Sequence, residues 1–369
     1  MRIGVDARTL TGFRGVPRYA RTLLETLARE YPQDEFRLFV PGREELPAAA
    51  ALRTMPNVAV HRHRLSGRVL FGAAAIARRP RLDRLLGGAV DVMWAPTVAP
   101  MALSAGVPLV LTVQDLSFEL RPHDFTSYER VWHALARPRT LARRAQLVIV
   151  LAEPTRQQLI ARWGLGAEAV RVVPAGVRGV GEPADPNGTL GRLGLSEGSY
   201  LLAVGALEPR KAPLLLSDAF ARARRRGLGA ELVFAGEGRL ADQLSGPGVR
   251  LLGRVSDDEL DALYTGAVAL VMPSLLEGYG LPVREALARG TPAVISDLPV
   301  FGEDLSQAVL RVPAGDETAL ADALVQIAGD DGLRSRLALA CRPAVAGMTW
   351  SQAARRTRAV LAEAAAAGG

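Results

Sequence analysis

The chain has 369 residues, which is too long for one ordinary core and suits two domains of about 150–200 residues each. Hydrophobic residues make up 49% and charged residues 22%, a balance that excludes a disordered chain. The single cysteine, Cys341, excludes an internal disulfide and a multi-cysteine metal site; nearly all of the positive charge behind the formal +7 is arginine, since Lys211 is the only lysine.

The N-terminal sequence MRIGVDARTL lacks the basic region and apolar run of a signal peptide, and no run of about 20 apolar residues follows. We therefore expect a cytoplasmic protein without a membrane span. Excess positive charge can attract nucleic acid, but the sequence contains no aromatic–basic RNA motif and no recognition helix. Nucleic acid is not an expected partner.

Short β-rich runs alternate along the chain with helical segments of about 10–20 residues. In chain order the runs are RIGVDA, FRLFV, VAVHRH, VDVMWAP, LVLTVQD, LVIVLA, VRVVPAG, LLAVGA, ELVFAG, VRLLG, ALVMPS, PAVIS and VLRVP. Continuous apolar strands that alternate with helices indicate parallel sheets covered on both faces. The sequence thus predicts an α/β protein with two doubly wound, Rossmann-like domains.

The domain boundary is expected near residues 178–196, where RGVGEPADPNGTLGRLGL is rich in Gly and Pro and predicts a linker with little structure. The predicted domains cover residues 1–180 and 195–345. The last segment has helical periodicity, and we expect a helix over 349–366 that packs back onto the N-terminal domain. In such sheets, ligands bind beyond the carboxyl ends of the strands, so the chemistry is expected at strand-to-helix turns.

The segment ALVMPSLLEGYGLPVREALARGTPAVIS is the most informative in the chain. It predicts a strand that ends at Pro273, a glycine-bearing loop with Glu277, and a helix with Pro282 in its first turn. The free amides of a helix N-terminus suit a phosphate. Glu285 can accept hydrogen bonds from ribose hydroxyls, and Glu277 can reach the sugar beyond the phosphates. Each glutamate alone could be an ordinary solvated residue at a helix start or in a loop. Their spacing, together with the neighbouring glycines and proline, favours a functional site.

Glu277 through Glu285 matches a pattern of two glutamates separated by seven residues, and the chain resembles the retaining glycosyltransferases of family four. That family contains the mannosyltransferase-like group 1 enzymes and has the GT-B fold, two Rossmann-like domains facing a central cleft. VGALEPRKAPLLLSDAF resembles the segment whose adjacent basic residues, here Arg210 and Lys211, bind the donor diphosphate. The resemblance implies that the donor is bound by Gly15, Arg254, Val255, Gly278, Tyr279, Gly280, Leu281 and Glu285.

The first half also resembles the family's opening, with a loop glycine, Gly15, and a helix that carries the expected acceptor-binding residues Arg18 and Tyr19. PLVLTVQDLSFEL has Gln114 and Asp115 where the family usually has His-Asp. Gln114 can form hydrogen bonds but cannot carry charge near neutral pH. The expected catalytic residues are Glu277, Arg210, Lys211, Asp115 and Gln114.

A second departure lies in LAEPTRQQL, where Ala152 and Pro154 replace an expected serine-rich turn while Glu153 and Arg156 fit. Either departure could alter the sugar or acceptor, or weaken catalysis. No metal ligand is expected. The four histidines, of which His61 and His63 are interpreted as surface residues on a strand, lack a metal-like spacing: they are His61, His63, His123 and His133.

Residues 62–84 are basic with interspersed apolar side chains. In membrane-associated relatives the same part of the acceptor domain meets anionic lipid, which a basic amphipathic stretch can do. The alternative is a helix packed on its own sheet with its arginines in water.

The resemblance implies a retaining transferase that moves a hexose from a nucleoside diphosphate sugar to a glycan, lipid-linked or natural-product acceptor, without a cofactor or metal. GDP-mannose is the first expected donor; UDP-N-acetylglucosamine, UDP-glucose and dTDP-deoxysugars stay open. The alternatives are a non-catalytic nucleotide-sugar-binding protein, which Gln114 would suit, and a nucleotide-sugar epimerase or pyridoxal-phosphate phosphorylase on the same fold. A module that binds RNA or membrane would rest on charge alone.

Overall fold

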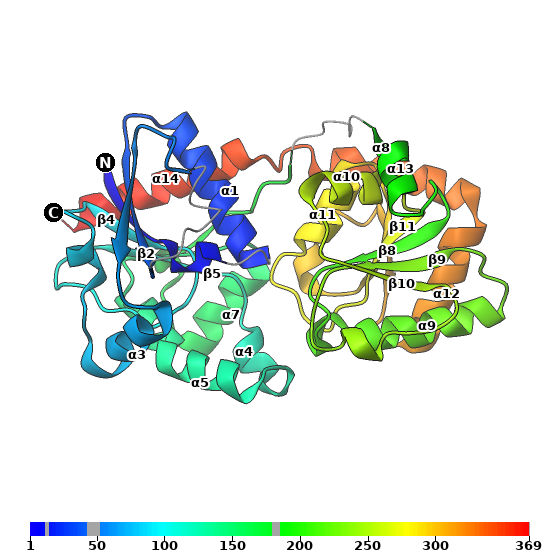
Figure 1. Cartoon of the computed structure of the whole chain (residues 1–369), viewed down its shortest axis with the longest axis horizontal. Helices are drawn as coiled ribbons and strands as arrows, with labels where there is room; N and C mark the ends of the chain where they lie inside the picture. Colours follow the sequence, from blue (N-terminus) through cyan, green and yellow to red (C-terminus); the bar gives the residue numbers. More distant parts are fainter. Residues whose placement is uncertain (12–14, 43–51, 179–184, 369) are drawn as a thin grey trace. The chain divides into compact units, whose positions relative to one another are not determined.

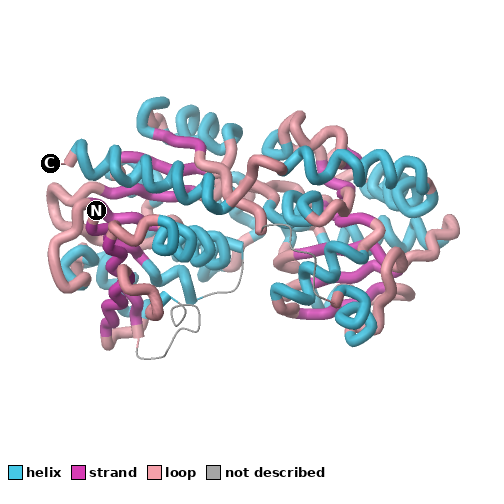
Figure 2. Tube along the Cα trace, turned by 90° about the horizontal axis from the view of Figure 1, so that it is seen from above, coloured by secondary structure: helices cyan, strands magenta, loops and turns pink. Residues whose placement is uncertain are grey.

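The structure, a computed structural model, describes four stretches of the chain: residues 1–11, 15–42, 52–178 and 185–368. It divides into two compact units (Figure 1). Unit 1 consists of Met1–Gly176 and Trp350–Gly369, and unit 2 consists of Val177–Thr349. In each unit, helices lie on both sides of a central sheet (Figure 2).

The sheet of unit 1 is parallel throughout and has the strand order β3-β2-β1-β4-β5-β6-β7. Its central strands β1, β4, β5 and β6 are almost completely buried, as strands covered on both faces must be. The strands are β1 (Arg2–Asp6), β2 (Glu35–Pro41), β3 (Val58–His63), β4 (Val92–Ala95), β5 (Leu109–Val113), β6 (Leu147–Val150) and β7 (Val170–Val172).

The sheet of unit 2 is also parallel and has the order β10-β9-β8-β11-β12-β13. Every β-rich run predicted from the sequence contains a strand, so the prediction of two parallel α/β sheets is confirmed. The strands are β8 (Tyr200–Val204), β9 (Glu231–Ala235), β10 (Val249–Gly253), β11 (Ala269–Met272), β12 (Ala293–Ser296) and β13 (Val309–Val312).

Local sequence explains where several helices begin. Thr126 and Glu129 form a capping box at the start of α5, and Ser256 and Glu259 form another at the start of α10. Among the described residues, the α-helices of unit 1 are α1 (Gly15–Glu30), α3 (Gly67–Ala77), α4 (Ser117–Leu120), α5 (Ser127–Ala136), α6 (Pro138–Arg144), α7 (Glu153–Trp163) and α14 (Trp350–Ala367). Those of unit 2 are α8 (Pro186–Arg192), α9 (Pro213–Arg225), α10 (Asp257–Gly266), α11 (Leu281–Ala288), α12 (Glu317–Gly329) and α13 (Asp331–Val345).

The last helix, α14, belongs to unit 1 although it follows the whole of unit 2 in the sequence. Its first residue, Trp350, packs against Tyr19 of α1 with 6.0 Å between ring centroids. Arg358 Nε donates to Asp34 Oδ2 at 2.6 Å, and Leu361 is fully buried. Helix α14 is therefore an integral part of the core of unit 1 (Figure 1).

Two expectations are wrong. The second half of the predicted linker is not irregular but forms α8, because Asp185 accepts a hydrogen bond from Gly188 N at 2.8 Å and Leu190 is buried. Residues 179–184 of that linker lie outside the described residues. His61 and His63 are half-buried rather than on the surface, and burial lowers the pKa of His61.

Strand order determines where a site can form. In both sheets the order reverses beside the first strand, between β1 and β4 in unit 1 and between β8 and β11 in unit 2. The loops that follow these two strands diverge at the carboxyl edge and leave room for a ligand. In unit 2 these are the loops that contain Lys211 and Glu277.

Candidate functional site

Two loops of unit 2 meet at the switch point between β8 and β11. After β8 the chain forms a short 3₁₀ turn, Pro209–Lys211, and after β11 it runs through a loop into α11. Leu275 N donates to the carbonyl of Arg210 at 2.8 Å and so ties one loop to the other. Parallel pairing of β8 with β11 thus places Lys211 beside Glu277, a residue 66 positions later.

Glu277 is held in position by two donors on one oxygen. Lys211 Nζ and Ser274 Oγ both donate to Glu277 Oε1, the latter at 2.7 Å. Only 6% of the Glu277 side chain and 15% of the Lys211 side chain are exposed. Burial raises the pKa of the Glu277 carboxyl, but the charges of Lys211 and Arg210 and the two hydrogen bonds outweigh it, so the pKa lies below its usual range. Glu277 is therefore a carboxylate at neutral pH.

The loop before α11 is fixed by a buried arginine. Arg284 donates to the carbonyls of Tyr279 and Val300, and its guanidinium lies over the Tyr279 ring, 4.0 Å from the centroid. The Tyr279 hydroxyl donates to Met348 Sδ at 3.7 Å. The Tyr279 side chain is thus part of the core, and the loop presents its backbone rather than this ring.

Gly280 caps α11 in a left-handed conformation with φ +72°. A Cβ atom here would lie 2.4 Å from Cε1 of Phe301, so the position requires glycine for both conformation and space. The predicted helix start, with Pro282 in the first turn, is confirmed because α11 begins at Leu281. The backbone amides at this start carry a partial positive charge suited to an anion.

Glu285 faces inward from α11 and is buried. The hydroxyl of Tyr264, in α10, donates to Glu285 Oε2 at 3.1 Å, and Thr291 Oγ1 donates to the carbonyl of Tyr264. Of the residues predicted to hold the base, Arg254 is exposed and Val255 half-buried in the turn between β10 and α10. All these residues lie in unit 2, as do Gly278 and Leu281.

The remaining predicted residues lie in unit 1. Gly15 is exposed and is the first residue of α1 rather than a loop residue, and Arg18 is half-buried on the same helix. Tyr19 is 1% exposed, so its ring forms part of the core against Trp350.

Gln114 and Asp115 follow β5 at its carboxyl end. Gln114 Nε2 donates to the carbonyl of Pro96 at 3.2 Å, and Asp115 Oδ1 accepts from Ser117 N at 2.8 Å. The glutamine is thus oriented by the loop after the neighbouring strand β4, while Asp115 shapes the turn into α4.

Sequence reasoning missed several residues that shape these sites. Ser274 could have been noticed three positions before Glu277, but Tyr264 gives no local signal because its partner lies 21 residues away. In unit 1, Arg8 and Asp6 form a buried ion pair at the end of β1, with Arg8 Nε 2.7 Å from Asp6 Oδ1.

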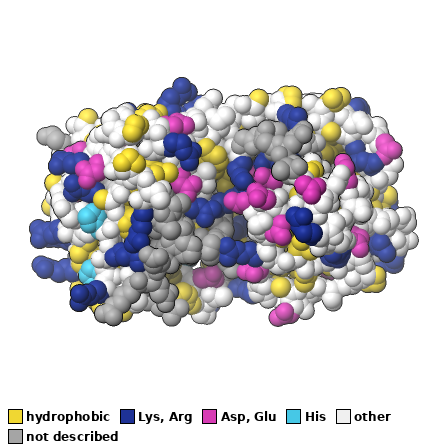
Figure 3. Space-filling view, turned by 45° about the horizontal axis from the view of Figure 1, so that its top comes forward, with side chains coloured by type: hydrophobic (Ala, Val, Ile, Leu, Met, Phe, Trp, Pro, Cys, Tyr) yellow, Lys and Arg dark blue, Asp and Glu magenta, His cyan; other side chains and the backbone are white. Residues whose placement is uncertain are grey.

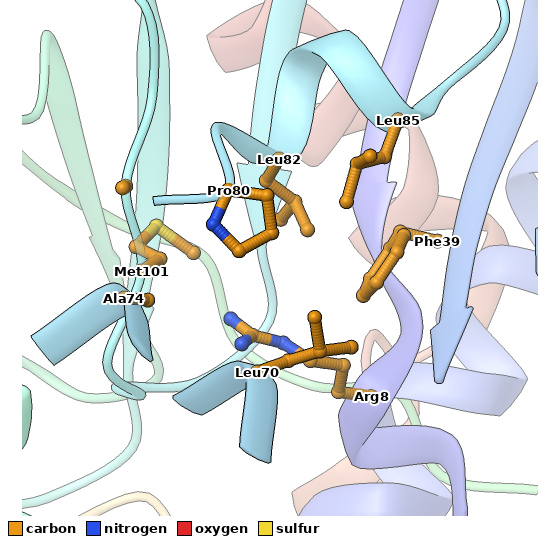
Figure 4. A pocket seen from close by; sticks show the side chains of 9 residues that line it. Arg8, Phe39, Leu70, Ala74, Pro80, Leu82, Leu85 and Met101 are labelled. Atoms are coloured by element: carbon orange, nitrogen blue, oxygen red, sulfur yellow. The ribbon is translucent and has the colours of Figure 1, made fainter. Parts of the chain in front are cut away.

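The Arg8 guanidinium lies among apolar side chains that include Leu70, Pro80 and Met101 (Figure 4). It also stacks over Phe71 at 4.0 Å from the ring centroid. The cavity beside it has a volume of about 10 Å³, enough for about one water molecule. We assign the Asp6–Arg8 pair a structural role, because it is paired and enclosed.

Within the described residues, no group of three or more His, Cys, Asp or Glu side chains could hold a metal ion. No helix in the described part of the chain has the length and apolar character needed to cross a bilayer. On the face shown in Figure 3, basic side chains are interspersed with acidic and apolar ones.

Comparison with known proteins gives the family. Residues 198–330 match the model of the glycosyl transferases group 1, and residues 13–178 match that of glycosyltransferase family 4. The chain therefore belongs to the family 4, group 1 glycosyltransferases, and its two Rossmann-like units form the GT-B fold.

Relatives and a solved structure agree with this assignment. D-inositol 3-phosphate glycosyltransferase of Nocardioides sp. is 31% identical over 58% of this chain and 52% of its own length. Phosphatidyl-myo-inositol mannosyltransferase of Mycobacterium leprae is 34% identical over 57% of this chain and 58% of its own length. HepE of Anabaena, crystallised with UDP and glucose, superposes with a TM-score of 0.69 at 18% identity, covering 98% of this chain and 100% of HepE. The match thus spans a little over half the length of these two curated relatives.

Proposed function

We propose that this protein is a retaining glycosyltransferase that transfers a hexose from a nucleoside diphosphate sugar to an acceptor, without a metal ion. The observation that carries the proposal is the buried group of Lys211, Glu277 and Ser274 beside Arg210, at the switch point of unit 2. Such an arrangement of fixed cations next to a helix N-terminus suits a diphosphate, and the adjoining carboxylate suits sugar hydroxyls.

In the proposed reaction the diphosphate departs with negative charge while the sugar becomes oxocarbenium-like. Arg210, Lys211 and the first backbone amides of α11 stabilise that charge. Glu277 accepts from Lys211 and Ser274 through Oε1, which leaves Oε2 to accept from a sugar hydroxyl. Glu285, oriented by Tyr264, binds the ribose. The acceptor attacks the face that the diphosphate leaves, and a donor phosphate oxygen takes its proton.

GDP-mannose is the first donor we propose, since the relative from M. leprae is named a mannosyltransferase. A UDP-sugar is the second, since HepE was crystallised with UDP and glucose. The acceptor classes stay as predicted: a glycan, a lipid-linked saccharide or a natural product. The two named relatives point to a phosphate-bearing acceptor, because one name contains inositol 3-phosphate and the other phosphatidyl-inositol.

We also propose contact with an anionic membrane through a surface formed by α3 and α5, which pack through Phe71 and Trp132 with 4.2 Å between centroids. We call it the α3–α5 surface; its exposed apolar side chains are Leu65, Val69, Ile76, Tyr128, Val131 and Leu135. Ile76 is 82% exposed and Tyr128 61% exposed. Arg64, Arg78 and Arg79 lie exposed beside α3 and provide the complementary charge.

Thermal unfolding with GDP, UDP, dTDP and ADP, each with a chelator, tests the proposal for the donor. Binding to the folded state alone stabilises it by about 2.7 kcal/mol at a hundredfold excess over Kd. One nucleotide is expected to raise the unfolding temperature without metal. If none of the four nucleotides raised the unfolding temperature, the proposal of an active transferase would be contradicted.

Substitution of the site separates a transferase from a binding protein. Lys211→Ala is expected to lower the transfer rate at least a hundredfold, since it removes a charge beside the leaving diphosphate. Glu277→Ala is expected to lose transfer while the nucleotide still binds, with Arg225→Ala on α9 as the control. Unchanged turnover in the Lys211 variant would remove the basis of the proposal, and product analysis distinguishes transfer from epimerisation.

A further inference from the structure

A second cavity, in unit 1, is far larger than the one beside Arg8. It lies between α4, α5 and α6, has a volume of about 480 Å³, and is lined by residues that include Phe118, Glu119, Arg130, His133, Arg137 and Arg139. We call it the α5 pocket. Its volume falls in the range of small-molecule sites. None of the residues assigned to the donor lines it.

The α5 pocket carries uncompensated positive charge. Its one carboxylate, Glu119, is already bound by Arg139 Nη2 at 2.8 Å, Arg162 Nε at 2.9 Å and Trp163 Nε1 at 2.9 Å. Among the described residues, Arg130 donates only to the Ser127 hydroxyl through its side chain, at 3.1 Å.

Arg137 has no side-chain hydrogen bond and no ion pair within the part of the chain that the structure describes. Arg130 and Arg137 therefore line the cavity without an acidic side chain as a partner among the described residues, since Glu119 is bound by other residues. Two guanidinium groups without counter-ions suit an anion with several oxygens, such as a phosphate or diphosphate.

Part of the pocket lining is apolar, formed by Phe118, Pro122, Ala134 and Pro138. The rings of Phe118 and His133 stack with 4.7 Å between centroids and an interplanar angle of 15°, and burial lowers the pKa of His133, which favours its neutral form. Ala134 lines the pocket, and Val131, one turn earlier on α5, is exposed on the α3–α5 surface. An apolar path thus leads along α5 from the pocket to that surface.

We propose that the α5 pocket binds the phosphate end of an amphiphilic acceptor, a phosphate or diphosphate ester of a hydrocarbon chain. Arg130 and Arg137 bind the phosphate oxygens, and the chain lies along Ala134, Val131 and the α3–α5 surface. That the ligand is an acceptor rests on the proposed function, whereas the binding of such a ligand to the α5 pocket does not.

Calorimetric titration of the full chain with geranyl diphosphate tests the proposal, with pyrophosphate and geraniol as probes of the two halves of the ligand. The pocket variant is Arg130→Gln/Arg137→Gln, and a matched control, Arg222→Gln/Arg225→Gln, removes two exposed charges from α9 in unit 2. A third variant, Arg210→Gln/Lys211→Gln, removes the cations of the donor site. Nucleotide binding is measured on all of them.

Geranyl diphosphate is expected to bind at least tenfold more weakly to the pocket variant, and equally well to the wild type and the α9 control. Affinity that falls only in the Arg210/Lys211 variant places the ligand in the donor site and overturns the proposal. If pyrophosphate binds as tightly as geranyl diphosphate, the proposed contact with the hydrocarbon chain is wrong. If geraniol binds as tightly, the proposed contact with the phosphate is wrong. A wild type that binds geranyl diphosphate but no nucleotide would contradict the proposed function and leave the pocket assignment intact.

Discussion

At the scale of single residues, the site depends on side chains that hold other side chains. Glu277 projects from a loop, where a free carboxylate would sample several rotamers, but Ser274 and Lys211 both bind its Oε1. Arg284 acts in the same way on the backbone, through the carbonyl of Tyr279. Enclosure of these groups strengthens each interaction, because water does not compete with it.

Ser274→Ala is expected to lower kcat about tenfold with little change in KM, because the carboxylate keeps its charge but loses part of its orientation. The hydrogen bond from Ser274 also lowers the pKa of Glu277, so its loss raises that pKa and moves the acidic limb of the pH–rate profile to higher pH. Ser296→Ala is the control, since Ser296 is equally buried and its hydroxyl has no hydrogen-bond partner among the described residues. An equal change of kcat and of the pH–rate profile in both variants would mean that Ser274 contributes only packing.

At the scale of elements, the parallel strands bring the loops together and the helix starts position their amides. Helix α11 must begin immediately after a turn that only glycine adopts without strain. Helix α14, which follows unit 2 in the sequence, must pack onto unit 1 to complete it. Both features depend on one or two contacts that can be tested by substitution.

Gly280→Ala is expected to lower the free energy of unfolding by about 1–2 kcal/mol from backbone strain alone, and the contact with Phe301 adds to that loss. Because the α11 amides move with the turn, nucleotide affinity is expected to fall as well. Gly229→Ala is the matched control, since Gly229 is outside the donor site, has no positive φ, and a Cβ there meets no atom of the described residues within 4 Å. Chemical denaturation and nucleotide titration of both variants measure the effects; a Gly280 variant as stable as the control would contradict this account.

Asp34→Asn is expected to lower the free energy of unfolding by about 2 kcal/mol near neutral pH, because it weakens the bond to Arg358 of α14. Burial raises the pKa of Asp34, but hydrogen bonds from Arg358 and the N-terminal amino group outweigh it and leave the pKa lowered. A lowered folded pKa means that this stability is present above the unfolded value of about 3.9 and is lost as pH falls through the folded value. Denaturation from pH 7 to pH 2 should show the free energies of unfolding of the wild type and Asp34→Asn converging only in acid. A difference that stays constant with pH would exclude the charge of the Asp34 carboxylate as its cause.

At the scale of the whole molecule, the formal charge of +7 is carried by arginines that mostly lie in water or in ion pairs. The α3–α5 surface differs, because exposed apolar side chains there adjoin exposed arginines. That combination favours an anionic lipid surface over neutral lipid.

Binding to vesicles that contain phosphatidylglycerol is expected for the wild type, and it should weaken with added salt because the charges are exposed. Ile76→Ser/Tyr128→Ser is expected to reduce binding several-fold in co-sedimentation. Leu339→Ser is the control, since Leu339 is a similarly exposed apolar side chain on α13 in unit 2. Equal binding to phosphatidylcholine vesicles, or an equal loss in the control, would contradict the proposal.

The sequence by itself determined the alternation of strands and helices, the two parallel sheets, the start of α11 with Pro282 in its first turn, and the family. These follow from local periodicity, turn residues and short motifs, which act between residues close in sequence. It did not determine α8 inside the expected linker, because burial of Leu190 depends on the rest of unit 2.

Only the tertiary structure decided that Ser274 and Lys211 share one oxygen of Glu277, that Tyr264 orients Glu285, and that the Tyr19 and Tyr279 side chains are core. It alone revealed the α5 pocket, whose arginines resemble many others in an arginine-rich sequence. The physical reason is common to all of them. Burial and partner choice are set by residues that strand order brings together across dozens of positions, and no local pattern encodes those distances.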